Sequence, residues 1–231
     1  MKKFLSQFST FEKVLYFASI SIIILCSLIF GNFDVSNTIC SLIGATALIF
    51  VSKGNPIGQL LTVVFGIFYA IISFRLRLFS EVITYAGMTS PIALIALITW
   101  IKNRYDKYEV KIAKLTKCKI LGLAISVIPV TAFMSFIMVK FNTPYIFLST
   151  TSIFTSYIAA YLTVCRSPYY ALGYSINDIV LIALWSLATK KDISYISIVV
   201  CFVVFLTNDI YGLYNWNKLK KIQKQGILLD K

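Results

Sequence analysis

The sequence IGQLLTVVFGIFYAIIS, residues 57–73, contains 17 residues without a charged side chain. A helix needs about 20 mostly apolar residues to cross the roughly 30 Å hydrocarbon core of a bilayer. Membrane β-barrel strands alternate in polarity, whereas this run is continuously apolar, so it indicates a helix. We predict an all-α integral membrane protein with about eight transmembrane helices. These are expected at residues 14–31, 35–51, 57–74, 82–101, 120–139, 145–164, 169–188 and 193–214.

The composition leaves little room for a water-soluble domain. Of the 231 residues, 58% are hydrophobic and 13% are charged, and the mean hydropathy is +0.82. Because so few polar side chains cannot cover a surface in water, we expect one transmembrane domain over residues 1–231, surrounded by lipid. The net charge of +13 does not indicate a nucleic-acid partner, because that function needs a basic soluble face.

The basic residues are distributed unevenly between the two ends of the predicted helices. Seventeen of the 22 Lys and Arg residues fall on one side, including those of the stretch 102–119. Basic residues accumulate on the cytoplasmic side, so we expect both termini to be cytoplasmic. The stretch 102–119 is predicted to be a solvated connector or to lie on the anionic leaflet. A cleaved signal peptide is disfavoured, because no small-residue cleavage site follows the first apolar run.

The two halves of the chain repeat weakly. SKGNP ends at Pro56 and CRSP ends at Pro168, each at a helix start, and each half ends in an aromatic and polar stretch around Trp100 or Trp216. One helix between two triplets gives both triplets the same direction. We therefore predict a parallel three plus one plus three repeat after an extra N-terminal helix, with a substrate site at the repeat interface. The first repeat should cover about 35–101, the linker helix about 120–139 and the second repeat about 145–214.

The predicted helix 57–74 carries one non-aliphatic stripe. Gln59, Thr62, Gly66, Tyr69 and Ser73 recur at spacings of three and four, which places them on one face. Hydrogen-bonding groups would be wasted on lipid, so the stripe should face the bundle interior, either for ligand contacts or for helix packing. Gln59 and Tyr69 are candidate substrate-binding residues, and the Gln59 amide can both donate and accept.

An ionisable side chain lies within the predicted helix 169–188. Tyr174, Asp178 and Trp185 share a face, and Asn177 flanks it. A carboxylate in a membrane needs a partner, a cavity or a proton. We predict that these four residues bind substrate, with structural hydrogen bonding as the alternative.

The same Asn-Asp dipeptide recurs in the last predicted helix. Asn208 and Asp209 are followed by Tyr211. Two such pairs in adjacent helices predict a shared polar pocket, so all three residues are candidate substrate contacts, although Asp209 could be only a gate or interfacial residue.

The predicted helix 82–101 adds Tyr85 and Thr89 to the candidate site. Glu81 precedes them at the outer boundary. Its side chain is expected either to contribute to the site or to pair with Arg75 or Arg77.

Two features are interpreted as structural. Pro91 interrupts the helix 82–101 and predicts a kink. Ser149, Ser152, Ser156 and Thr163 share one face of the helix 145–164, which favours close helix packing.

Several kinds of catalytic machinery are missing from the sequence. There is no His, and the five Cys residues have no metal-ligand spacing. A P-loop and a Ser nucleophile elbow are also absent. We predict no enzyme, no catalytic residue, no metal and no cofactor. An acid/base pair of Asp178 and Asp209, a receptor and an assembly subunit are the alternatives from other classes.

Four segments resemble one transporter family. They are GNPIGQLLTVVFGIFYAIISF, FSEVITYAGMTSPIALIALITWIKN, RSPYYALGYSINDIVLIALW and LTNDIYGLYNWNKL. They resemble the nicotinamide riboside transporters of the PnuC family, particularly Gram-positive members. The resemblance implies a core like that of SWEET sugar transporters and facilitative uptake into a bacterial cell, with cytoplasmic phosphorylation trapping the substrate. It also allows a homo-oligomer such as a trimer.

One family feature is missing. Members that carry nicotinamide riboside often show W-x-x-W, and no two of Trp100, Trp185 and Trp216 have that spacing. Relatives are thought to carry thiamine, riboflavin or deoxynucleosides, so another vitamin or nucleoside is the alternative substrate.

Overall fold

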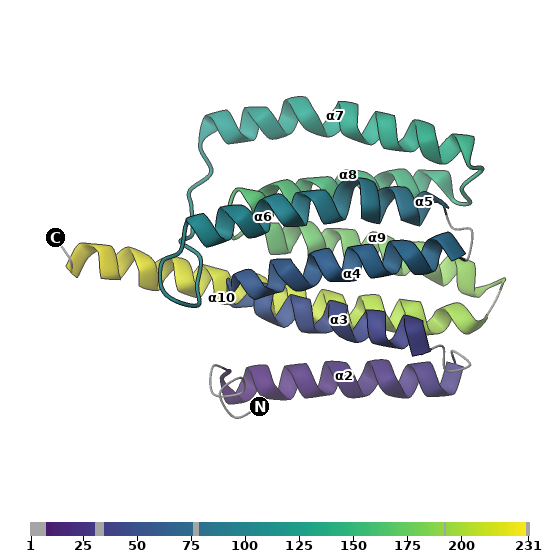
Figure 1. Ribbon diagram of the computed structural model, residues 1–231, viewed down its shortest axis with the longest axis horizontal. Coiled ribbons are helices and arrows are strands. Elements are labelled where there is room, and N and C mark those ends of the chain that lie inside the picture. Colours follow the sequence, from purple (N-terminus) through teal and green to yellow (C-terminus); the bar gives the residue numbers. More distant parts are fainter. Residues whose placement is uncertain (1–7, 31–34, 76–78, 192, 230–231) are drawn as a thin grey trace.

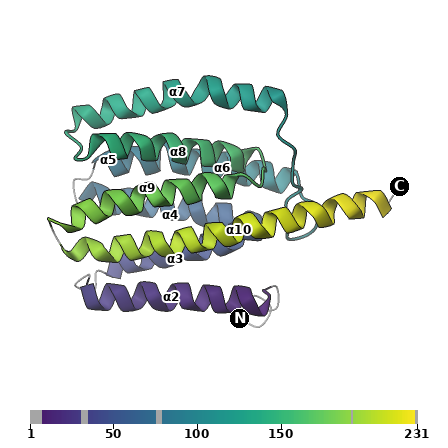
Figure 2. The ribbon, with the colours of Figure 1, turned by 180° about the vertical axis from the view of Figure 1, so that it is seen from behind.

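The bundle consists of long helices that run side by side (Figures 1 and 2). The computed structural model describes residues 8–30, 35–75, 79–191 and 193–229. Within these residues, eight helical spans are long and apolar enough to cross a membrane, which confirms the predicted fold class. The elements are α2 (Thr10–Phe30), α3 (Val35–Ser52), α4 (Pro56–Arg75), α5 (Phe79–Val82), the π-helix η1 (Ile83–Thr89), α6 (Ser90–Lys102), α7 (Lys117–Lys140), α8 (Ile146–Val164), α9 (Tyr170–Thr189), the 3₁₀ turn η2 (Ile193–Tyr195) and α10 (Ile196–Leu229).

Six helices form a closed ring. Helix α3 packs on α4, α4 on α6, α6 on α8, α8 on α9, α9 on α10, and α10 returns to α3. Helix α2 lies outside the ring against α3 and α10, and α7 lies outside it against α8 (Figure 1). The ring therefore consists of the two predicted triplets, α3, α4 and α6 and then α8, α9 and α10. The predicted extra helix, α2, and the predicted linker helix, α7, lie outside it. The parallel repeat itself stays a prediction.

The turns before α4 and α9 have matching geometry. Gly54 and Arg166 are both left-handed, with φ of 69° and 58°, and a glycine relieves that strain only in the first turn. The next residue in each turn, Asn55 or Ser167, donates its N–H to a carbonyl of the preceding helix at 3.0 Å. The two turns lie 112 positions apart, which supports the predicted repeat.

Two tryptophans join the triplets at one end of the ring. Trp100 Nε1 donates to the Thr163 carbonyl at 2.9 Å, and Trp216 Nε1 donates to the Val51 carbonyl at the same distance. Both indoles have no exposed surface, and their rings are 5.3 Å apart. Each indole donates to a carbonyl near the end of a helix in the other triplet, and that carbonyl also accepts the N–H of Gly54 or Arg166 from the following turn.

The stretch between α6 and α7 is more ordered than a solvated connector. Val110, only 1% exposed, donates its N–H to the Gly54 carbonyl at 2.9 Å, and Ala113 N–H donates to the Arg166 carbonyl at 3.0 Å. The Gln223 side chain bonds to the Ile112 N–H and to the Val110 carbonyl. The basic side chains of the connector stay exposed. Its backbone, however, is hydrogen-bonded to both left-handed turns.

Two helices differ from the predicted outline. The last helix continues to Leu229, well past residue 214, because polar residues outside a membrane also sustain a helix. The irregularity expected at Pro91 takes the form of η1, and Pro91 itself lies in the first turn of α6. A π-turn accommodates the carbonyl that a proline ring displaces from the preceding turn.

Candidate functional site

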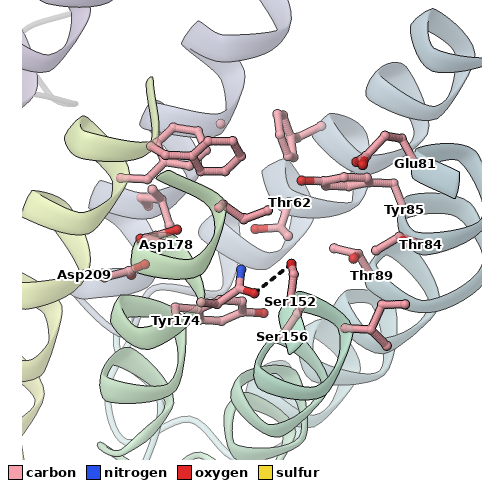
Figure 3. Close-up of a pocket in the computed structure, with 18 of the residues that line it drawn as sticks. Thr62, Glu81, Thr84, Tyr85, Thr89, Ser152, Ser156, Tyr174, Asp178 and Asp209 are labelled. Carbon is pink, nitrogen blue, oxygen red and sulfur yellow. Dashed lines mark hydrogen bonds between the residues drawn. The ribbon is translucent and has the colours of Figure 1, made fainter. Parts of the chain in front are cut away.

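A pocket lies inside the ring, with an empty volume of about 1050 Å³ including the space at its mouth. Its lining combines aromatic and aliphatic side chains with hydrogen-bonding groups (Figure 3). The polar and ionisable lining residues are Gln59, Thr62, Glu81, Thr84, Tyr85, Thr89, Ser149, Ser152, Ser156, Tyr174, Asn177, Asp178 and Asp209.

The structure brings seven of the eleven predicted site residues into this lining. They come from α4, η1, α9 and α10, which are distant in the sequence and meet across the ring. Their contact with substrate stays a prediction. The seven are Gln59, Tyr85, Thr89, Tyr174, Asn177, Asp178 and Asp209.

Asp178 and Asp209 form the acidic centre of the pocket. Each residue is only 4% exposed, and Figure 3 shows the two side chains together on one side of the pocket. Because two negative charges oppose each other in one buried site, we expect one of the two carboxyl groups to keep its proton. Asp178 Oδ2 is buried and lacks a hydrogen-bond partner within the described part of the chain. This atom is therefore an acceptor that a ligand can satisfy.

Asn177 is held by the neighbouring helix. Its Oδ1 accepts hydrogen bonds from Ser152 Oγ at 3.1 Å and Thr155 Oγ1 at 2.9 Å; the bond from Ser152 is drawn in Figure 3. Both bonds use the amide oxygen, so the Nδ2 group is the end left to donate to a ligand.

Aromatic rings cover another part of the wall. The Phe65 ring lies 5.8 Å from that of Tyr85 and 6.3 Å from that of Phe205, and Phe202 lies 5.9 Å from Phe205. A Cβ atom on Gly44 would lie 2.8 Å from Phe205 Cζ. The missing side chain of Gly44 therefore allows these rings to approach α3.

The comparisons with known proteins agree with this geometry. A family model described as "Nicotinamide mononucleotide transporter" matches residues 34–218. The chain belongs to this family. A curated relative, the nicotinamide riboside transporter PnuC of Neisseria mucosa, is 24% identical over 192 residues, covering 80% of this chain and 72% of the relative. The fold is similar to a crystal structure of the vitamin B3 transporter PnuC, with a TM-score of 0.78, 21% identity and 94% of each chain covered. The chain is accordingly a multi-pass membrane transporter and not an enzyme.

Four predicted site residues of this transporter lie outside the pocket lining. The Tyr69 ring packs on that of Tyr85, with centroids 4.5 Å apart, and of these two rings only Tyr85 lines the pocket. Trp185 packs on Tyr195, with ring centroids 5.4 Å apart. The adjacent Leu184 does line the pocket, and neighbouring residues of a helix point about 100° apart, so Trp185 faces Tyr195 and not the cavity.

Asn208 and Tyr211 instead fasten α2 to the ring. Asn208 Nδ2 donates to Ser19 Oγ at 3.1 Å, and Tyr211 OH donates to Glu12 Oε1 at 2.8 Å. Glu12 also pairs with Lys53 at 3.0 Å. The second Asn-Asp dipeptide is therefore divided, because adjacent residues of a helix point about 100° apart: Asp209 faces the cavity and Asn208 faces α2.

The sequence interpretation missed other parts of the lining. Ser149, Ser152 and Ser156 were expected to pack helices, and the structure places all three on the pocket wall. Their spacing of three and four was the available signal, the same as that of the Gln59 stripe. Phe65 and Phe205 gave no signal, because aromatic residues are ordinary in an apolar run.

Glu81 also lines the pocket. The alternative of pairing with Arg75 is wrong, because the ion pair found among the described residues joins Lys53 to Glu12. Arg77 lies outside the described residues. Glu81 thus contributes a carboxyl group to a cavity whose described lining residues include neither Lys nor Arg.

Proposed function

We propose that this transporter carries nicotinamide riboside into the cell by facilitated diffusion. The observation that carries the proposal is a pocket at the centre of the six-helix ring that combines aromatic rings, an amide donor and carboxyl groups, with no basic side chain among the described residues that line it. A positively charged planar ring suits the aromatic and acidic groups, and ribose hydroxyls suit the amide and carboxyl groups. The relative from Neisseria mucosa bears the same substrate in its name.

Uptake of labelled substrate into proteoliposomes tests the proposal. Nicotinamide riboside should enter faster than thiamine, riboflavin or deoxynucleosides, each supplied at the same concentration. Entry of thiamine without nicotinamide riboside would refute the proposed substrate and favour the alternative of another vitamin or nucleoside.

The proposed mechanism is passive, with cytoplasmic phosphorylation trapping the product. The sequence contains no nucleotide-binding P-loop. Collapsing the proton and sodium gradients should leave the initial uptake rate nearly unchanged in vesicles that lack a kinase. A several-fold loss of rate would show ion coupling instead.

We also propose that both termini and the stretch 102–119 face the cytoplasm of a bacterial cell. The uneven distribution of Lys and Arg supports this orientation. Lys107 is exposed in the connector, so Lys107→Cys provides a labelling site. The exposed Cys118 is first replaced by Ser. Reaction with an impermeant thiol reagent should require disrupted cells, and labelling of intact cells would reverse the topology.

The proposed assembly is a homo-oligomer such as a trimer. Exposed apolar side chains on the outer helices are compatible with both lipid and protein neighbours. The mass of the protein in nanodiscs distinguishes a trimer from a single chain.

A further inference from the structure

The pocket has two chemically different acidic poles. Figure 3 shows Glu81 beside Tyr85 on one side, and Asp178 and Asp209 together on the opposite side. Given the proposed function, we infer that Glu81 and its neighbouring aromatic rings select the cationic ring of the substrate, while the Asp178–Asp209 pair binds the ribose hydroxyls. The inference therefore fixes the orientation of the substrate and assigns Glu81 as its charge-selecting residue.

The Glu81 pole has the features of a cation site. Glu81 has no ion pair with any described residue, and the described residues that line the cavity include no Lys or Arg. The rings of Tyr85 and Phe65 follow along the same wall. A pyridinium ring can stack on such faces while its positive charge remains near the carboxylate, and the two attractions reinforce each other away from water.

The local backbone presents these groups to the cavity. Glu81 lies in the four-residue α5, and the π-helix η1 follows at once. Glu81, Thr84 and Tyr85 all reach the pocket wall. A π-turn is an uncommon conformation that is frequent at functional sites, and here it lies in the segment that joins the acidic and aromatic groups.

The opposite pole has the features of a hydroxyl site. A carboxyl pair in which one group keeps its proton, as expected for two acids in one buried site, offers both a donor and acceptors, as a ribose diol requires. Asp178 Oδ2 is a buried acceptor without a partner among the described residues, and the neighbouring Asn177 keeps its Nδ2 end as a donor. Tyr174 lies close to the pair (Figure 3).

The reverse orientation fits less well. It would place hydroxyl groups against the Tyr85 and Phe65 faces, where hydrogen bonds are poor, and would leave Glu81 without a cation. It would also place the planar ring against a carboxyl pair that is already partly neutralised by its own proton. The preferred orientation satisfies both poles.

A ligand pair that differs by one hydride on the ring, and so in ring charge, tests the inference. Nicotinamide riboside has a cationic ring, and its reduced 1,4-dihydro form has the same ribose and carboxamide on a neutral ring. Glu81→Gln should weaken binding of the cationic form about tenfold or more, because the carboxylate attraction is lost. The same variant should weaken binding of the neutral form less than about twofold, and this retained binding also shows that the variant is folded.

The carboxyl pair should behave differently with the same two ligands. Asp209→Asn should weaken both forms by similar factors, and a 2′,3′-dideoxy analogue of nicotinamide riboside should lose little further affinity in this variant. Glu109→Gln is the matched control, because Glu109 lies in the connector outside the pocket; it should leave both affinities unchanged.

The outcomes separate the inference from the proposed function. Equal losses for the cationic and neutral ligands in Glu81→Gln, or a selective loss of the cation in Asp209→Asn, would overturn the orientation while wild-type uptake still supported the function. Failure of the wild-type protein to bind or transport nicotinamide riboside would overturn the proposed function itself.

Discussion

The reciprocal indole bonds predict that Trp100 and Trp216 each stabilise the fold substantially. Replacement by Phe removes the Nε1 donor and leaves the Thr163 or Val51 carbonyl without its 2.9 Å partner. Each carbonyl keeps a second bond, from the Arg166 or Gly54 N–H, so only the indole hydrogen bond is lost, which costs about 0.5 to 1.5 kcal/mol. The smaller ring also leaves a gap at a site with no exposed surface, which adds about 1 kcal/mol. Each single variant should therefore lose about 1.5 to 2.5 kcal/mol of unfolding free energy.

The two substitutions should not be additive. The indole centroids are only 5.3 Å apart, and residues in contact usually couple by about 0.5 to 3 kcal/mol. Reversible unfolding of the four proteins, wild type, Trp100→Phe, Trp216→Phe and the double variant, gives the coupling directly. Trp185→Phe is the matched control, because no indole hydrogen bond of Trp185 is found among the described residues. Losses below about 0.5 kcal/mol in both single variants would refute the stabilising role of the two bonds.

Three further predictions concern the pocket and its surroundings. Gln59→Ala and Asn177→Ala should each lower substrate affinity about tenfold, because each removes a hydrogen bond worth about 1 to 3 kcal/mol; unchanged equilibrium binding in folded protein would contradict the site. Gly44→Ala should displace Phe205, because the new Cβ would lie 2.8 Å from its ring, and should lower both thermal stability and affinity; a wild-type melting temperature would show that the ring moves freely. Tyr211→Phe should lower the unfolding free energy by about 1 to 3 kcal/mol through loss of the bond to Glu12, while substrate affinity stays within about twofold of the wild type. A larger loss of affinity would show that Tyr211 contacts the substrate.

The sequence carried most of the information about the fold because membrane helices follow a simple rule. A long apolar run must satisfy its backbone within one helix, so the positions of the runs predicted the eight membrane helices, although the last one continues to Leu229 and does not end at residue 214. The π-turn at Ile83–Thr89 could not be predicted in the same way, because it depends on how the turn before Pro91 packs against α4 and α8. The ordered backbone of the connector was not predicted either, because it depends on hydrogen bonds to Gly54 and Arg166, which are distant in the sequence.

The site was predictable where polarity itself was unusual. Asn177 and Asp178 stood out as polar residues in an apolar helix, and both line the pocket. The same reasoning could not separate Asp209 from Asn208, because both are polar and only the position of α2 determines which one faces the cavity. It also could not assign Phe205, whose apolar side chain fits lipid, protein core or pocket equally well.

The connector limits how the two triplets can move apart. Val110 is bonded to the turn of one triplet and Ala113 to the turn of the other, and only three peptide steps separate them. A fully extended chain gains at most about 3.6 Å per residue, so the two turns are tethered within roughly 11 Å of chain. Any rocking that separates the turns further must detach the connector from one of them. The connector therefore limits how far the two triplets can separate at this end of the ring. A wider separation requires the loss of at least one of the two backbone hydrogen bonds.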